Sequence, residues 1–93
     1  MVDKELLKID VQSFCDAYSY QQAVEHDKKI ERALEYTVAD NNTEYNTLFL
    51  QEIYQCFQAM RADQMVVCRG KGCHACDYYE KSMTVISQFR SAI

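Results

Sequence analysis

The chain has 93 residues, of which 48% are hydrophobic and 26% are charged, and its formal net charge is −4. This composition is typical of a globular domain and excludes the class of disordered chains, which combine low hydrophobicity with high charge. A chain of this length is expected to fold as one domain, residues 1–93, with a core small enough that a bound metal ion would add usefully to its stability.

The sequence predicts a cytoplasmic protein with no membrane partner. No apolar run approaches the length needed to cross a bilayer, and the first residues lack the basic start and long apolar stretch of a secretory signal. The chain contains five cysteines, an odd number. In a reducing compartment, a short cysteine cluster binds a metal or takes part in catalysis more often than it forms disulfides.

The first two-thirds of the chain are predicted to be helical. There is no proline, and no glycine precedes Gly70, so strong helix breakers are missing there. Two sets of apolar residues recur at intervals of three or four, which places each set on one helical face. These sets are Leu7, Val11, Phe14 and Tyr18, and then Ile30, Leu34 and Val38. We expect a break near residues 26–27 rather than one long bent helix, with Asp27 as the N-cap of the second helix.

A further helix is expected after residues 40–43, whose side chains favour turns and helix caps. An apolar stripe runs through residues 44–62 and contains Phe49, Ile53, Cys56, Phe57 and Met60. Residues 65–67 include two valines, and we expect them to be extended.

A final helix is expected after Cys76, with Asp77 as its N-cap. Its apolar face would contain Tyr79, Met83, Ile86 and Ile93. The predicted fold class is therefore all-α, a small domain of three to four helices.

Three cysteines, Cys68, Cys73 and Cys76, fall within residues 68–76. Four residues separate the first pair and two separate the second, and both spacings are found where paired cysteines hold a tetrahedral zinc ion. The chain's two glycines, Gly70 and Gly72, lie between the first pair and allow the backbone to bend. The sequence therefore predicts a zinc knuckle that holds a structural Zn²⁺ and joins the last two helices.

A closed structural zinc site needs a fourth ligand. We place His74 slightly ahead of Cys56 for this role, although the side chains of adjacent residues usually diverge. Cys56 is an alternative only if its helix ends early, because an unbroken helix would separate it from Cys68 by about 18 Å. Cys15 and His26 are further alternatives. As isolated cysteines, Cys15 and Cys56 are otherwise expected to be core residues.

The charge is distributed unevenly along the chain. Residues 1–60 carry five Lys or Arg side chains against eleven carboxylates, a formal charge of −6, whereas residues 61–93 carry five against three, a formal charge of +2. No carboxylate pair, serine–histidine arrangement or phosphate loop indicates an enzyme or a small-molecule substrate. We expect a zinc-stabilised regulatory adaptor or inhibitor that binds a larger protein through an acidic, tyrosine-bearing face, with a nucleic-acid-processing machine as one form of target.

Two alternative functions have some support in the sequence. A nucleic-acid-binding zinc module would use a basic and aromatic patch to stack bases and contact phosphates. The residues of that patch are Arg69, Lys71, Tyr78 and Lys81. A thiol-redox protein would use Cys73 and Cys76 near a helix start, where the helix dipole lowers thiolate pKa values. The all-helical pattern argues against the second alternative, because thioredoxin-like motifs accompany a βαβ unit.

Overall fold

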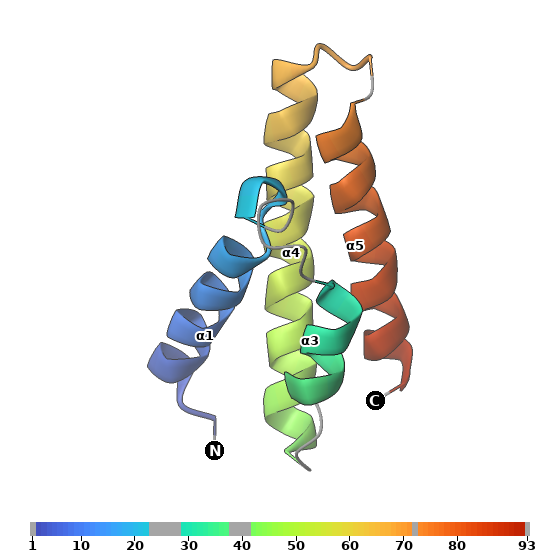
Figure 1. Ribbon diagram of the computed structural model, residues 1–93. Coiled ribbons are helices and arrows are strands. Elements are labelled where there is room, and N and C mark those ends of the chain that lie inside the picture. The colour runs from blue at the N-terminus through green and yellow to red at the C-terminus, as the bar shows by residue number, and fades with distance from the viewer. Residues whose placement is uncertain (1, 23–28, 38–41, 72, 93) are drawn as a thin grey trace.

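The computed structural model describes residues 2–22, 29–37, 42–71 and 73–92 (Figure 1). Within these ranges all regular structure is helical and no strand is present, which confirms the predicted all-α class. The helices whose bounds lie within these ranges are α1 (Lys4–Ala17), α3 (Ile30–Thr37), α4 (Thr43–Val67) and α5 (His74–Ala92). Residues 20–22 are helical as well, so the predicted count of three to four helices is too low.

Helix α1 begins at a side-chain cap. The carboxylate of Asp3 accepts hydrogen bonds from the backbone N–H groups of Glu5, at 3.1 Å, and Leu6, at 3.2 Å. Such a cap satisfies N–H groups that have no partner within the helix. Helix α1 ends at Ala17, and helical backbone resumes at residues 20–22.

The predicted separation of the N-terminal helices is confirmed, since α1 ends well before α3 begins at Ile30. The first described interruption lies at residues 18–19, earlier in the chain than expected. Residues 26–27, where we expected the break, the cap Asp27 and the alternative ligand His26, lie outside the described residues.

Helix α4 begins where the capping residues predicted. The side-chain oxygen of Asn42 accepts a hydrogen bond from the N–H of Tyr45 at 3.1 Å. The helix then continues to Val67, so the extended conformation predicted for residues 65–67 is wrong. The N–H of Cys68 still bonds to the carbonyl of Gln64, at 2.9 Å. Strand preference depends strongly on context, and no other described segment offers these valines a strand to pair with.

Helix α5 begins four residues earlier than predicted, and Asp77 is not its cap. Asp77 lies in the first turn of a helix that starts at His74. Cys73 takes the cap position, because its carbonyl accepts from the N–H of Asp77 at 3.0 Å and its sulfur accepts from the N–H of Cys76 at 3.5 Å. The Cys73 sulfur, and not the Asp77 carboxylate, therefore caps the start of α5.

Helices α4 and α5 form a long antiparallel hairpin, with α1 packed against α4 and α3 against α5 (Figure 1). The core lies between them, and its central ring is Phe57 of α4, which is 0% exposed. The centroid of this ring lies 6.3 Å from that of Phe14 and 6.0 Å from that of Tyr79. The predicted stripes supply this core, except that Val38 and Ile93 lie outside the described residues.

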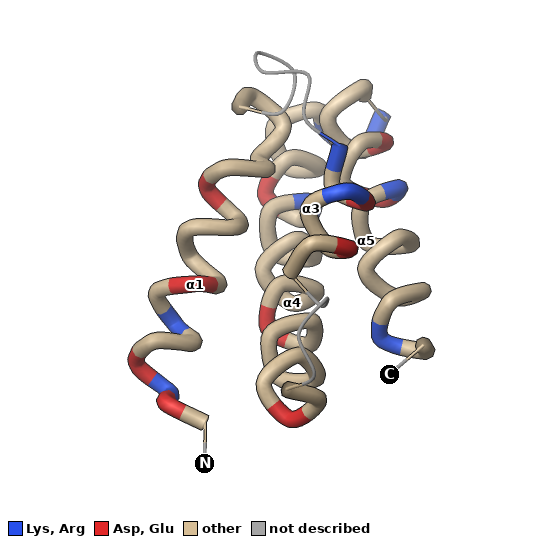
Figure 2. The backbone as a smooth tube through the Cα atoms, turned by 60° about the horizontal axis from the view of Figure 1, so that its bottom comes forward, with Lys and Arg blue, Asp and Glu red and all other residues tan. Residues whose placement is uncertain are grey.

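Acidic residues recur along α1 and α4 (Figure 2). An ion pair of 3.4 Å between Arg61 and Glu80 joins α4 to α5, and a pair of 2.9 Å between Lys81 and Asp77 lies within α5. Such partly exposed pairs contribute little to stability, typically up to about 1 kcal/mol.

None of the helices in the described ranges has both the length and the apolar character required to span a bilayer.

Candidate metal centre

The turn after α4 reverses the chain by a Schellman motif. The N–H of Arg69 donates to the carbonyl of Val66 at 3.3 Å, and the N–H of Gly70 donates to the carbonyl of Met65 at 3.0 Å. Arg69 and Gly70 both have positive φ, 57° and 72°. The predicted role of glycine in this reversal is therefore confirmed at Gly70, while Arg69 occupies the position that glycine usually takes. Gly72 lies outside the described residues.

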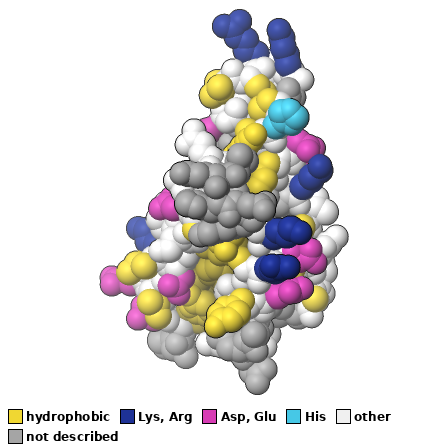
Figure 3. Space-filling model, viewed as in Figure 1, with side chains coloured by type: hydrophobic (Ala, Val, Ile, Leu, Met, Phe, Trp, Pro, Cys, Tyr) yellow, Lys and Arg dark blue, Asp and Glu magenta, His cyan; other side chains and the backbone are white. Residues whose placement is uncertain are grey.

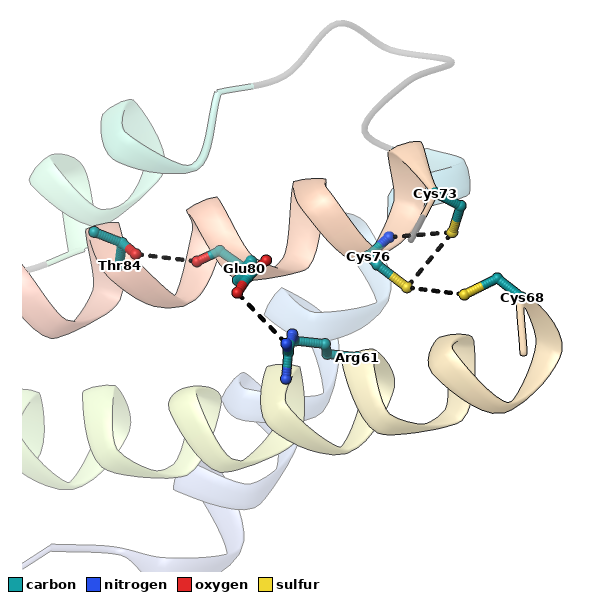
Figure 4. Close-up of polar contacts among 6 residues, drawn as sticks. All are labelled: Arg61, Cys68, Cys73, Cys76, Glu80 and Thr84. Carbon is teal, nitrogen blue, oxygen red and sulfur yellow. Dashed lines mark hydrogen bonds and ion pairs between the residues drawn. The ribbon is translucent and has the colours of Figure 1, made fainter. Parts of the chain in front are cut away.

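The turn brings three sulfur atoms together (Figure 4). Cys68 is the C-cap of α4, Cys73 precedes α5, and Cys76 lies in the first turn of α5. Their Sγ atoms all lie within 4.8 Å of one another, and Cys76 Sγ is 3.5 Å from each of the other two. Thiolates bound to a tetrahedral zinc ion at 2.3 Å lie about 3.8 Å apart, whereas a disulfide bond is about 2.05 Å long. The spacing therefore fits sulfur ligands around one ion.

The pKa values of Cys73 and Cys76 are shifted in opposite directions. A hydrogen bond from the backbone N–H of Cys76 is the main cause that lowers the pKa of Cys73 to about 7, with further bonds from the Cys76 thiol and Gln64. Burial is the main cause that raises the pKa of Cys76 to about 12. The Cys73 thiol is therefore about half ionised at neutral pH before any ion binds, and a bound cation would favour ionisation of the Cys76 thiol as well.

We expect iodoacetamide to modify Cys73 much faster than Cys76 in metal-free, fully reduced protein at neutral pH. Iodoacetamide reacts with thiolates, so the initial rate at Cys73 should be half-maximal at a pH of about 7, while that at Cys76 should still rise up to a pH of about 12. Peptide mass spectrometry at short times gives both rates. Buried Cys15 provides the slow reference, and faster modification of Cys76 than of Cys73 would contradict the assignment.

Gln64 was not identified from the sequence as part of this site. Its side-chain nitrogen donates to the sulfur of Cys73 at 3.6 Å. Gln64 precedes Cys68 by four residues, and helical residues at this spacing lie on the same face. Gln64 could have been identified from the spacing of four residues if α4 had been expected to continue to Val67. The prediction of an extended segment at residues 65–67 removed that signal.

The two leading candidates for a fourth ligand are not part of the sulfur cluster. His74 is exposed at the start of α5, and no nitrogen of its ring lies within the group. Because α4 runs unbroken to Val67, Cys56 lies about 18 Å along the helix from Cys68. Cys56 is therefore too far from Cys68 to bind the same ion. The identity of the fourth ligand stays a prediction.

Cys15 and Cys56 instead face each other between α1 and α4. Burial, followed by a hydrogen bond with the thiol of Cys56, raises the pKa of Cys15 well above its ordinary value. Cys15 is 2% exposed, and Cys56 is partly buried against the core. Both cysteines therefore occupy the core positions expected for them, and Cys15 is not in the sulfur cluster.

The four residues of the nucleic-acid alternative have different environments. Arg69 and Lys71 are exposed in the turn. The hydroxyl of Tyr78 donates to the carbonyl of Tyr18 at 2.7 Å, and burial raises the pKa of Tyr78 to about 12. Lys81 forms its ion pair within α5. This arrangement favours a packing role for Tyr78 over base stacking.

No protein-family model, curated protein or solved structure matches this chain. The chemistry of the site is therefore inferred from its geometry, in which the end of α4 and the start of α5 bring three thiols together.

Proposed function

We propose that Cys68, Cys73 and Cys76 bind one zinc ion that clamps the connection between α4 and α5. The observation that carries this proposal is the convergence of three sulfur atoms within 4.8 Å of one another. Thiolates are soft ligands that bind zinc, copper(I) and iron–sulfur clusters, and zinc is the usual ion where the role is structural. The positive end of the α5 dipole lies beside Cys73 and Cys76 and favours their thiolate forms.

The ion would link the end of α4 to the start of α5 in addition to the turn that joins them covalently. Below the turn, the hairpin is joined by core packing and by the ion pair between Arg61 and Glu80 (Figure 4). Ligands that assemble only in the folded chain couple metal binding to folding. The ion would thereby fix the end of α4 against the start of α5.

The zinc-clamped bundle would serve as a small cytoplasmic regulatory adaptor or inhibitor that acts by binding a larger protein. Its support is the excess of acidic residues in the first 60 positions, together with exposed Tyr36, which is 87% accessible on α3. Tyrosine is enriched at protein interfaces because its ring is apolar and its hydroxyl is polar. We include the components of nucleic-acid-processing machines among the targets to be tested.

Affinity purification of the full chain, with elemental analysis of the same sample, tests both parts of this proposal. We expect one zinc ion per chain, and we expect the double substitution Glu31→Lys and Glu35→Lys on α3 to reduce the amount of specifically copurified protein about tenfold, measured by mass spectrometry. Reversal of Lys29 and Arg32 to glutamate on the same segment is the matched control and should retain the partner.

Two results would overturn these assignments separately. If the acidic and basic reversals gave the same copurified proteins in the same amounts, the acidic face would not be the binding surface. If reduced protein bound no zinc and formed a Cys73–Cys76 disulfide on exposure to oxidised glutathione, the thiol-redox alternative would replace the metal site.

A further inference from the structure

The sulfur cluster presents three ligand atoms of the same kind (Figure 4). Cys76 Sγ lies 3.5 Å from Cys68 Sγ and 3.5 Å from Cys73 Sγ, and all three atoms lie within 4.8 Å of one another. Among the residues that the structure describes, no histidine, aspartate or glutamate side chain joins this group. A tetrahedral zinc ion would use the three sulfurs and one further ligand, whereas an element that forms three bonds to sulfur would use the cluster as it stands.

Trivalent arsenic has the bonding that matches such a cluster. It forms three bonds arranged as a pyramid, with a lone pair of electrons in place of a fourth ligand. It is also a soft acceptor, and thiolates are the soft ligands of proteins. In the pyramid all three sulfur atoms lie on one side of the arsenic and close to one another, as the end of α4 and the start of α5 place them.

Solvent has access to the cluster at one end of the molecule. The protein has principal extents of 42 × 23 × 22 Å, and the α4–α5 turn lies at one end of the long axis (Figure 1). Figure 3 shows Lys and Arg side chains extending into solvent at this end. Cys68 and Cys73 are partly exposed, whereas Cys76 is only 7% exposed. A small molecule would therefore bond first to Cys68 or Cys73 and last to Cys76.

The reaction of these thiols with arsenite needs no oxidant or reductant. At neutral pH arsenite is present as uncharged arsenous acid, which has three As–OH bonds. Each sulfur forms a bond to arsenic as one As–O bond breaks, and the thiol proton leaves with the hydroxide as water. Three thiols thus release three water molecules, the arsenic stays trivalent, and the product is uncharged. An uncharged product suits the buried position of Cys76, because the burial of a charge is costly.

We propose that Cys68, Cys73 and Cys76 bind arsenite, with one arsenic atom per chain held by three As–S bonds. Once the first bond has formed, the two remaining thiols act at a high effective concentration. Cys15 and Cys56 form a separate pair between α1 and α4, so they offer no more than two bonds. The inference uses the sulfur atoms of the proposed zinc site, so arsenite and zinc exclude each other, but it does not depend on zinc binding.

Native mass spectrometry of the metal-free full chain measures the bound arsenic. The chain is kept reduced with a phosphine, because a dithiol reductant would itself capture arsenite. We expect an adduct whose mass equals that of the chain plus one arsenic atom minus three hydrogen atoms, which corresponds to three As–S bonds. X-ray absorption at the arsenic edge should show three sulfur neighbours and no oxygen neighbour.

Equilibrium dialysis with arsenite tests which thiols form these bonds. Cys68→Ser, Cys73→Ser and Cys76→Ser should each weaken binding at least about tenfold, because each variant retains only two of the three sulfurs. Cys56→Ser is the matched control and should bind arsenite as the native chain does. Circular dichroism shows whether each variant is folded, and the two measurements on the native chain decide the bonding even where a variant does not fold.

Three results would overturn the proposal: a native chain that binds no arsenic, an adduct that keeps an As–O bond, or folded serine variants of the cluster that bind as tightly as the native chain. Titration of the same preparation with zinc separates this proposal from that of the zinc clamp. Arsenite binding without zinc binding would remove only the zinc clamp, and zinc binding without arsenite binding would remove only the arsenic site.

Discussion

Removal of the zinc ion that we propose for the sulfur cluster is expected to lower the midpoint of thermal unfolding by about 10–20 °C. An ion present at about 100 times its dissociation constant stabilises the folded state by about 2.7 kcal/mol. In a domain of this size, each kcal/mol corresponds to about 4–8 °C. Differential scanning calorimetry of fully reduced protein, with zinc and with chelator, measures the change.

Single substitutions of the sulfur ligands should reproduce the effect of chelation. Cys68→Ser, Cys73→Ser and Cys76→Ser should each remove most of the response of the unfolding temperature to zinc. Cys56→Ser is the matched control, since Cys56 lies on the same helix as Gln64 but contacts Cys15 instead of the cluster. Equal unfolding temperatures in zinc and in chelator for the native chain would show that no ion clamps the hairpin.

Replacement of Phe57 by alanine should lower the free energy of unfolding by about 3–5 kcal/mol. Phe57 is 0% exposed and lies between the rings of Phe14 from α1 and Tyr79 from α5. The substitution removes apolar contacts and leaves a cavity that the surrounding helices can fill only in part. Chemical denaturation followed by circular dichroism measures the loss.

Gln58→Ala provides the control for this core substitution. Gln58 is the next residue along α4 but is exposed, so its replacement should change the free energy of unfolding by no more than about 0.5 kcal/mol. A loss below about 1 kcal/mol for Phe57→Ala would mean that the three-helix contact around this ring does not hold the bundle together. Zinc should be present at the same concentration in both measurements, so that the metal does not contribute to the difference.

The helical segments could be predicted from the sequence because their signals are local. The repeat of apolar residues at intervals of three and four identified the stripes that now form the core, and Asn42 marked the beginning of α4. The helix ends were less accessible. Two valines at residues 66–67 suggested an extended segment, but continued helical hydrogen bonds carry α4 to Val67.

The candidate site was predictable in part for the same reason. The spacing of Cys68, Cys73 and Cys76 predicted that their sulfur atoms could meet, and the structure brings them within 4.8 Å of one another. The contribution of Gln64 and the meeting of Cys15 with Cys56 depend on helical register and on packing between helices distant in sequence. No short motif records such contacts.

The sequence by itself determined that this chain is helical and that three thiols gather in one turn, since periodicity and cysteine spacing act over a few residues. The tertiary structure decided which thiols belong to the sulfur cluster. Because α4 is unbroken, Cys56 lies far from the turn and contacts Cys15 of α1. It also decided which apolar residues lie outside the core. The packing of α1 on α4 buries Leu7 but leaves Leu6 and Ile9 exposed, because one helix can turn only one face toward its neighbour.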